Sequence, residues 1–271
     1  MRSRTRKLAL LAIGAALAAM LLADFAAAQK RPRDPKLPPP GPAPRAADGH
    51  AVLGGATPEE KGVFAPLFGI TEPIAPADKV PFQPWAKALY DSRQKHELEP
   101  HTRCKASGTA RQFQTPYGVE FVELPEQGRI YIFDIGGPHT FRTIYTDGRS
   151  HPADLEPSYY GHSIGWWEGD TLVVDSTGFN ESFWLDRRGL PHTTAMHTVE
   201  RFRRTDSETI AYQITVHDPG AYTADWTGDF QLQRDPGVEL FEYVCQQANY
   251  AIELMVGGER SSVDRSSPIV P

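Results

Sequence analysis

Residues 161–165 read Gly-His-Ser-Ile-Gly and fit the G-x-S-x-G pattern that surrounds the nucleophile of many serine hydrolases. In those enzymes the serine stands on a sharp turn between a buried strand and a helix. Here residues 151–160 contain two prolines and two acidic residues, and residues 166–174 read as a turn followed by a β run. The flanking sequence lacks the required setting. We therefore expect Ser163 to hydrogen-bond to backbone, with Gly161 and Gly165 at bends, rather than to act as a nucleophile.

Histidines and carboxylates further along the chain offer acid–base chemistry. A neutral imidazole beside a carboxylate is a general base near neutral pH, because the carboxylate fixes the tautomer of the ring. We predict such a pair from His192 or His162 with Asp186, and Asp175 is an alternative carboxylate. Asn180 would then donate a hydrogen bond to a developing oxyanion. The alternative for both histidines is a hydrogen-bonded structural role.

The same region contains donors for a divalent metal, namely His192, His197 and Glu200. Zinc and similar ions bind imidazole nitrogen and carboxylate oxygen. The spacing H-x4-H-x2-E does not match a helical H-E-x-x-H site, and residues three apart on a strand point to opposite faces. We therefore expect no metal and no other cofactor.

Four of the five tryptophans of the chain lie in one third of the sequence. They are Trp166, Trp167, Trp184 and Trp226. Aromatic walls with a few polar groups between them are typical of pockets for small organic molecules. Arg201 could hold the carboxylate of an anionic ligand, although arginines on a strand often form a solvated face. The alternative for the tryptophans is core packing.

The first 28 residues have the features of a signal peptide. Four basic residues precede an apolar run that ends near three consecutive alanines. The run is too short for a confident membrane span, so we expect a periplasmic or secreted protein with no membrane contact after cleavage. Cleavage removes four basic residues and one acidic residue, which changes the formal net charge from −6 to −9. Such a charge argues against a nucleic-acid partner and leaves a small molecule as the expected partner.

The chain contains two cysteines, Cys104 and Cys245. An oxidising compartment permits a bond between them, so we predict a disulfide that clasps the folded region.

Composition divides the mature chain into four parts. Residues 29–49 are rich in proline and read as a disordered tether. Residues 50–103 read as an irregular arm with one helix at 84–95, and residues 259–271 as a flexible tail. Residues 104–258 show short β-branched and aromatic runs between turn residues. We expect a mainly β domain, an antiparallel barrel or sandwich that is lipocalin-like in general shape, with a short C-terminal helix at 240–256.

Several sequence blocks together resemble a large set of exported bacterial proteins that have no assigned activity. These blocks are G-H-S-I-G-W-W-E-G-D-T-L-V-V from residue 161, L-P-H-T from residue 190 and V-E-R-F-R from residue 199. The resemblance covers about residues 104–250. It supports export and the disulfide, and it implies no reaction.

The sequence therefore leads to three functional hypotheses. The first is an exported protein that binds a small organic molecule in an aromatic and His-lined pocket. The second is a lyase, isomerase or hydrolase with a His/Asp acid–base pair. The third is an envelope module that binds another protein.

Overall fold

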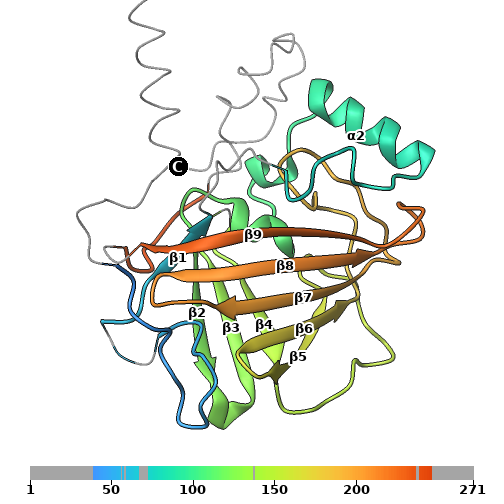
Figure 1. Ribbon diagram of the computed structural model, residues 1–271. Coiled ribbons are helices and arrows are strands. Elements are labelled where there is room, and N and C mark those ends of the chain that lie inside the picture. Colours follow the sequence, from blue (N-terminus) through green and yellow to red (C-terminus); the bar gives the residue numbers. More distant parts are fainter. Residues whose placement is uncertain are drawn as a thin grey trace, which may run out of the picture.

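The computed structural model describes residues 39–245, apart from residues 56, 58, 67–72, 137 and 236–237. Nine strands close into one barrel in the order in which they occur along the chain (Figure 1). They are β1 (Val63–Pro66), β2 (Val119–Leu124), β3 (Arg129–Asp134), β4 (Phe141–Tyr145), β5 (His162–Glu168), β6 (Thr171–Thr177), β7 (His197–Arg204), β8 (Thr209–His217) and β9 (Trp226–Asp235). The expectation of a mainly β fold is confirmed, and the sheet is a closed barrel rather than a sandwich.

One strand pair is parallel. Strands β4 and β5 run in the same direction, and all other neighbours are antiparallel. A closed sheet with an odd number of strands must contain at least one parallel pair, so a purely antiparallel barrel is excluded. Parallel neighbours need a long crossover connection, and residues 146–161 provide it. This crossover replaces the hairpin that joins most other neighbours.

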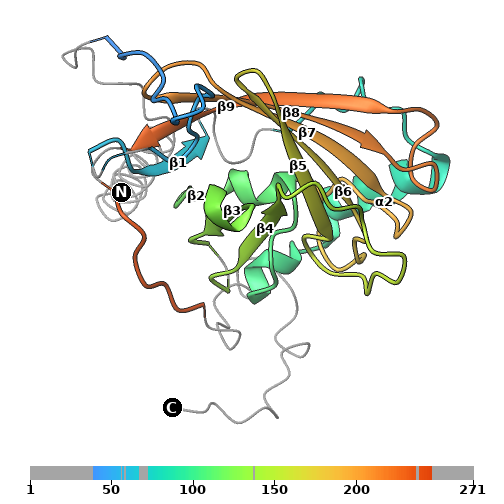
Figure 2. The ribbon, with the colours of Figure 1, turned by 90° about the horizontal axis from the view of Figure 1, so that it is seen from below.

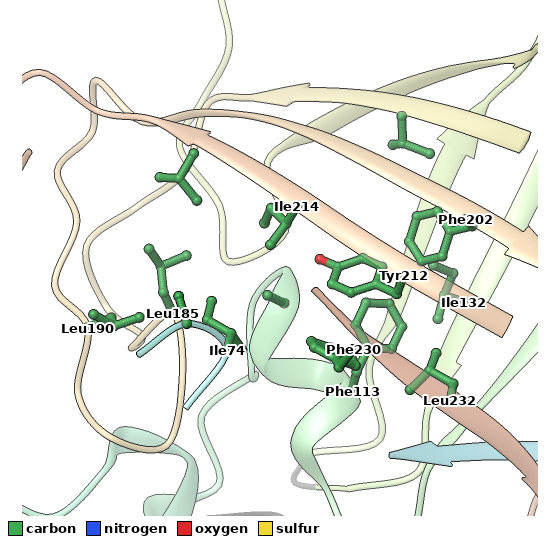
Figure 3. Packing of buried hydrophobic residues seen from close by; sticks show 14 of the residues in the cluster. Ile74, Phe113, Ile132, Leu185, Leu190, Phe202, Tyr212, Ile214, Phe230 and Leu232 are labelled. Atoms are coloured by element: carbon green, nitrogen blue, oxygen red, sulfur yellow. The ribbon is translucent and has the colours of Figure 1, made fainter. Parts of the chain in front are cut away.

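The interior of the barrel is filled by side chains. Burial alternates along β3, β7, β8 and β9, as expected when one face of each strand points inward. The short helix η2 (Ala110–Gln114) is buried at all five residues and lies within the curve of the sheet (Figure 2). Its Phe113 packs against Tyr212 and Phe230, with ring centroids 4.8 and 6.2 Å away (Figure 3). Helix η2 thus fills part of the barrel interior.

A buried ion pair crosses the same interior. Arg142 on β4 and Glu200 on β7 are both almost fully buried, and two nitrogens of the guanidinium group bond to the two carboxylate oxygens, one pair of atoms lying 3.0 Å apart. The remaining hydrogen bonds of the two groups go to hydroxyl groups of Thr109, Ser163, Ser176 and Tyr212. Every nitrogen of Arg142 therefore has a partner, as a buried charge requires.

Helix α2 (Pro84–His96) confirms the predicted helix and begins with a proline, which is favourable in the first turn. It lies at one end of the barrel, where Trp85 Nε1 donates to the carbonyl of Gly220, 2.9 Å away, in the β8–β9 loop (Figure 1). Two further short helices, η1 (Pro100–Arg103) and η3 (Pro125–Gln127), flank the first barrel strands.

The described part of the expected tether contacts the barrel. The Gly41 amide donates to Ser207 Oγ at 3.0 Å, and Arg45 forms an ion pair with Asp170. Further on, the carbonyls of Val52 and Leu53 accept hydrogen bonds from Arg204. The expected arm also supplies strand β1, which closes the barrel between β2 and β9. Prolines in this segment concealed a barrel strand, because β1 is only four residues long and ends at Pro66.

The predicted disulfide is present. Cys104 and Cys245 are bonded, with their Cα atoms 5.6 Å apart. Residues 240–245 are not helical, and the rest of the expected C-terminal helix lies outside the described residues, as do the expected leader and tail. Within the described part of the chain, no helix is long and apolar enough to span a membrane.

The ion pair leads to a test of stability. Arg142→Leu leaves the Glu200 carboxylate buried without its cation and should lower the free energy of unfolding by about 3–5 kcal/mol. The double variant Arg142→Leu/Glu200→Leu removes both charges and should recover much of that loss, since buried ion pairs are often replaceable by apolar residues. Urea unfolding followed by tryptophan fluorescence measures both variants.

The control for this test is Arg201→Leu. Arg201 pairs with Glu168 on the exposed outer face, so its loss should cost less than about 1 kcal/mol. A double variant no more stable than Arg142→Leu alone would contradict the explanation based on an unpaired charge.

Candidate functional site

Ser163 of the G-x-S-x-G block lies on β5 and points into the barrel. Its Oγ accepts a hydrogen bond from Arg142 Nε at 3.0 Å and from Ser176 Oγ at 2.9 Å. Within the described residues no imidazole bonds to this hydroxyl, so it has no base to activate it. The partners are side chains rather than the backbone groups we expected. Gly161 does sit at a bend with a positive φ of 61°, whereas Gly165 lies within the strand, where an added Cβ would come within 2.7 Å of Ile144.

The predicted pair of Asp186 and His192 is not hydrogen-bonded. Asp186 is fully buried and accepts backbone hydrogen bonds from Arg188 and Leu190, 3.0 and 3.1 Å away. Burial raises the pKa of Asp186 to about 6. His192 Nε2 lies 3.1 Å from the carbonyl oxygen of Phe183, and burial lowers the pKa of His192 to about 4. Both side chains bond to backbone of the loop between β6 and β7, so they stabilise this loop and do not form the predicted acid–base pair.

The other predicted residues of that site are also separate. Asn180 Oδ1 accepts a hydrogen bond from the Ser182 amide at 3.0 Å, as in an Asx turn. Trp166 is 43% exposed on the outer face, where it and Arg201 both bond to Glu168. Neighbouring residues of a strand point to opposite faces, so Trp167 cannot line the same pocket as Trp166.

The remaining aromatic candidates are engaged elsewhere. Trp167 stacks on His50 with ring centroids 4.0 Å apart. Trp184 lies under the guanidinium of Arg93, and Trp226 packs edge-on against Tyr222. The predicted aromatic residues therefore do not form one wall.

Four other side chains do converge, and we call them the His–Asp cluster: His151, His162, Asp175 and His197. Asp175 Oδ1 lies 3.0 Å from His151 Nε2 and 2.8 Å from His197 Nε2. The Nδ1 atoms of His151 and His162 lie 2.8 Å apart. The side chains of His151, Asp175 and His197 are 21%, 24% and 37% exposed, so solvent reaches the cluster.

The barrel topology assembles this cluster. Three of its members lie on neighbouring strands: His162 on β5, Asp175 on β6 and His197 on β7. The residue after each of them is buried, and since side chains alternate between the two faces of a strand, all three point outward. His151 lies in the crossover between the parallel strands β4 and β5, which returns the chain to the start of β5. Sequence reasoning identified three of these residues separately. The signal that could have joined them is the outward alternation on consecutive strands.

The hydrogen bonds favour one set of tautomers. A carboxylate accepts, so His151 and His197 donate to Asp175 through Nε2–H. Nδ1 of neutral His151 then carries a lone pair and accepts from Nδ1–H of His162. His162 consequently presents the lone pair of its Nε2, which makes no hydrogen bond within the described residues. The cluster is an Asp–His–His chain with a basic nitrogen at its end.

The surroundings of His162 keep it neutral. Burial lowers the pKa of His162 below its usual value, and the nearby His151 and Arg149 lower it further. The ring also stacks on Tyr145, with centroids 5.1 Å apart. A base must be unprotonated before it can accept a proton, so this environment favours general-base chemistry near neutral pH.

A second cluster of polar side chains surrounds Asp134. Asp134 accepts hydrogen bonds from Ser107 Oγ at 3.0 Å and from Tyr160 OH at 3.3 Å, and Ser107 also lies 3.0 Å from His101 Nδ1. Burial raises the pKa of Asp134 to about 7 and lowers that of His101 to about 4. Ser107 and Asp134 are buried, so a substrate could not reach them without local opening. We therefore place the candidate site at the His–Asp cluster.

The residues considered for a metal lie apart. His192 bonds to a backbone carbonyl, His197 to Asp175, and Glu200 to Arg142 inside the barrel. In the part of the chain that the structure describes, no three His, Cys, Asp or Glu side chains are placed to hold a metal ion.

Comparison of the chain with protein-family models, with curated proteins and with solved structures found no match.

The buried Asp134 predicts a pH dependence of stability. Its pKa is raised in the folded state from 3.8 to about 7, so the stability that it contributes is full below pH 3.8 and is lost as the pH rises through 7. Asp134→Asn stays neutral, so the variant should gain stability relative to the wild type between pH 4 and 8, by an amount on the order of a few kcal/mol. Urea unfolding across this pH range measures the difference, and Asp229→Asn, an exposed carboxyl on β9, is the control. A constant difference between wild type and Asp134→Asn would contradict the shift.

Proposed function

We propose that the protein is an exported enzyme that binds a small organic molecule at the His–Asp cluster and transfers a proton to or from it. The observation that carries this proposal is the shared carboxylate oxygen of Asp175, which holds two imidazoles in fixed tautomers on a solvent-accessible surface. The reaction class is that of a lyase, isomerase or hydrolase. Each of these includes a proton transfer that an oriented imidazole accelerates.

His162 is the proposed base. When Nε2 of His162 takes a proton, its Nδ1–H can pass a proton to Nδ1 of His151, so that the positive charge moves to the ring that the Asp175 carboxylate holds, as in other carboxylate–histidine chains. His197 bonds to the same oxygen and is the proposed second acid–base group. A removed proton could then be returned to a different atom of the substrate, which is what an isomerase or a lyase needs.

The outer face is favoured over the interior as the binding region. A lipocalin-like protein would hold its ligand inside the barrel. In this protein Phe113, Phe202 and Tyr212 pack together there, with ring centroids 4.8–5.7 Å apart (Figure 3). The Tyr212 hydroxyl also donates a hydrogen bond to Glu200 of the buried ion pair. The proposed binding surface thus carries histidines and Tyr145 rather than tryptophans.

The proposal includes export to the periplasm or beyond. It is supported by the leader-like residues 1–28 and by the disulfide between Cys104 and Cys245, since such bonds persist in oxidising compartments. We also propose kinship with the exported bacterial proteins that share the sequence blocks from residues 161, 190 and 199.

Deuterium exchange tests the proposal without knowledge of the substrate. The mature protein is incubated in D2O with a pool of small metabolites, and mass spectrometry detects deuterium at carbon-bound positions. We expect exchange in at least one compound, and His162→Gln should slow it by about 100-fold or more, the usual contribution of a general base. Asp175→Asn should also slow it, because the amide no longer fixes the tautomers.

The control for the exchange experiment is His96→Gln. His96 is the exposed last residue of helix α2 and has no hydrogen bond to the His–Asp cluster, so its loss should leave the exchange rate unchanged. A compound that binds, exchanges no carbon-bound hydrogen and is not hydrolysed would identify a binding protein rather than an enzyme. Exchange that survives His162→Gln would show that another group is the base.

A further inference from the structure

Positive charge lies next to the His–Asp cluster. Tyr145, which stacks on His162, also contacts two guanidinium groups: the Arg149 carbon Cζ is 4.0 Å from the centre of the tyrosine ring, and that of Arg129 is 5.7 Å away. Arg129 on β3 is the direct cross-strand partner of Tyr145 on β4. Both arginines therefore border the surface on which a substrate of His162 must lie.

The two arginines differ in their partners. Arg149 forms three side-chain hydrogen bonds with Asp147, the shortest of 2.6 Å, which compensate its charge. Arg129 donates only to the hydroxyl of Tyr131, at 3.4 Å, and its Nε atom is buried with no hydrogen-bond partner among the described residues. A buried donor without an acceptor is uncommon in a folded protein, and it indicates a place for a missing acceptor.

The local charges do not balance. Arg129 and Arg149 contribute two positive charges, and Asp147 supplies a carboxylate that pairs with Arg149, so the charge of Arg129 is left over. Asp175 does not compensate it, because its Oδ1 is shared by two histidines. An anion bound beside Arg129 would supply both the missing charge and the missing acceptor.

We propose that the molecule bound at the His–Asp cluster is a small monocarboxylate, and that Arg129 binds its carboxylate group beside Tyr145. This inference rests on the proposed function for its location, but it requires binding only and no turnover. A guanidinium group presents parallel N–H donors that match the two oxygens of a carboxylate. A monoanion neutralises the single uncompensated charge of Arg129, whereas a phosphate dianion would exceed it.

The position of Tyr145 limits the shape of the molecule. Arg129 and His162 contact the same tyrosine ring, so a carboxylate held by Arg129 leaves the rest of the molecule within reach of His162 Nε2. Acetate is too short to occupy both places, and a carboxylate on a ring or on a chain of a few carbons is long enough.

Binding of benzoate tests this inference, with benzamide as the neutral molecule of the same shape. NMR signals of the His162 ring, assigned from the His162→Gln variant, report binding to the full mature protein. We expect benzoate to shift these signals with a millimolar Kd and benzamide to leave them unchanged. Arg129→Gln should weaken benzoate binding at least about tenfold, since a charge-assisted hydrogen bond contributes about 1.5–3 kcal/mol and each 1.4 kcal/mol is tenfold. The affinity of Arg129→Lys for benzoate should lie between those of the wild type and of Arg129→Gln. Lysine keeps the positive charge but lacks the parallel N–H donors of a guanidinium group.

The matched control is Arg203→Gln, an exposed arginine on β7, which should bind benzoate like the wild type. Equal binding of benzoate and benzamide, or undiminished binding by Arg129→Gln, would overturn the inference. Tighter binding of phenylphosphonate than of benzoate would overturn the assignment to a monocarboxylate. Benzoate binding that persists in His162→Gln, followed through the Tyr145 ring signals, would support the anion site even if no deuterium exchange were found, so the two proposals can fail separately.

Discussion

The ion pair between Arg142 and Glu200 is the constraint on which the rest of the structure depends. Two charges inside a barrel are costly unless each has a complete set of partners. The hydroxyls of Ser163 and Ser176 help to complete the set, and they come from β5 and β6, so the pair connects strands that are not neighbours. A shift of any of these strands by one residue would turn its polar group outward and leave a buried charge unsatisfied. The network therefore specifies strand register as well as filling space.

This control of strand register matters most where the parallel strands β4 and β5 meet. The two parallel strands share only two residue pairs in register, whereas most antiparallel neighbours share five or more. Arg142 belongs to β4 and Ser163 to β5, so their hydrogen bond connects the two parallel strands inside the barrel. On the outside, the crossover that the parallel pair requires brings His151 onto His162. One topological requirement thus underlies both the interior network and the candidate site.

The strands with a plain alternation of apolar and polar residues were predictable from sequence. β8 is an example, because its buried apolar residues recur at every second position, which is typical of a strand with one face in the core. β5 was missed because the glycines of the G-x-S-x-G block read as bends. The strand is regular there since Gly165 packs closely against Ile144, with no room for a Cβ. The disulfide was predictable because two cysteines, in a chain expected to be exported, have one possible pairing.

The candidate site was less accessible to prediction. His192 and Asp186 are six residues apart, and that proximity suggested a pair. Each side chain instead forms hydrogen bonds with backbone groups of its own loop. The members of the His–Asp cluster are up to 46 residues apart in the chain, as the numbers of His151 and His197 show. They meet because β5, β6 and β7 are neighbours and because a crossover was needed before β5. The parallel pair follows from the number of strands, which depends on the four-residue strand β1 that the sequence concealed.

The position of β1 also has a consequence for how the chain acquires its structure. β1 pairs with β9, whose last residue is Asp235, so the barrel cannot close until nearly the whole domain has been synthesised. Such long-range pairing slows folding. Until β9 is in place, the growing sheet has two unpaired edges, which are the usual starting points for aggregation. Phe113 precedes β2 in the chain, so the aromatic ring against which Tyr212 and Phe230 pack is already present when the last strands form.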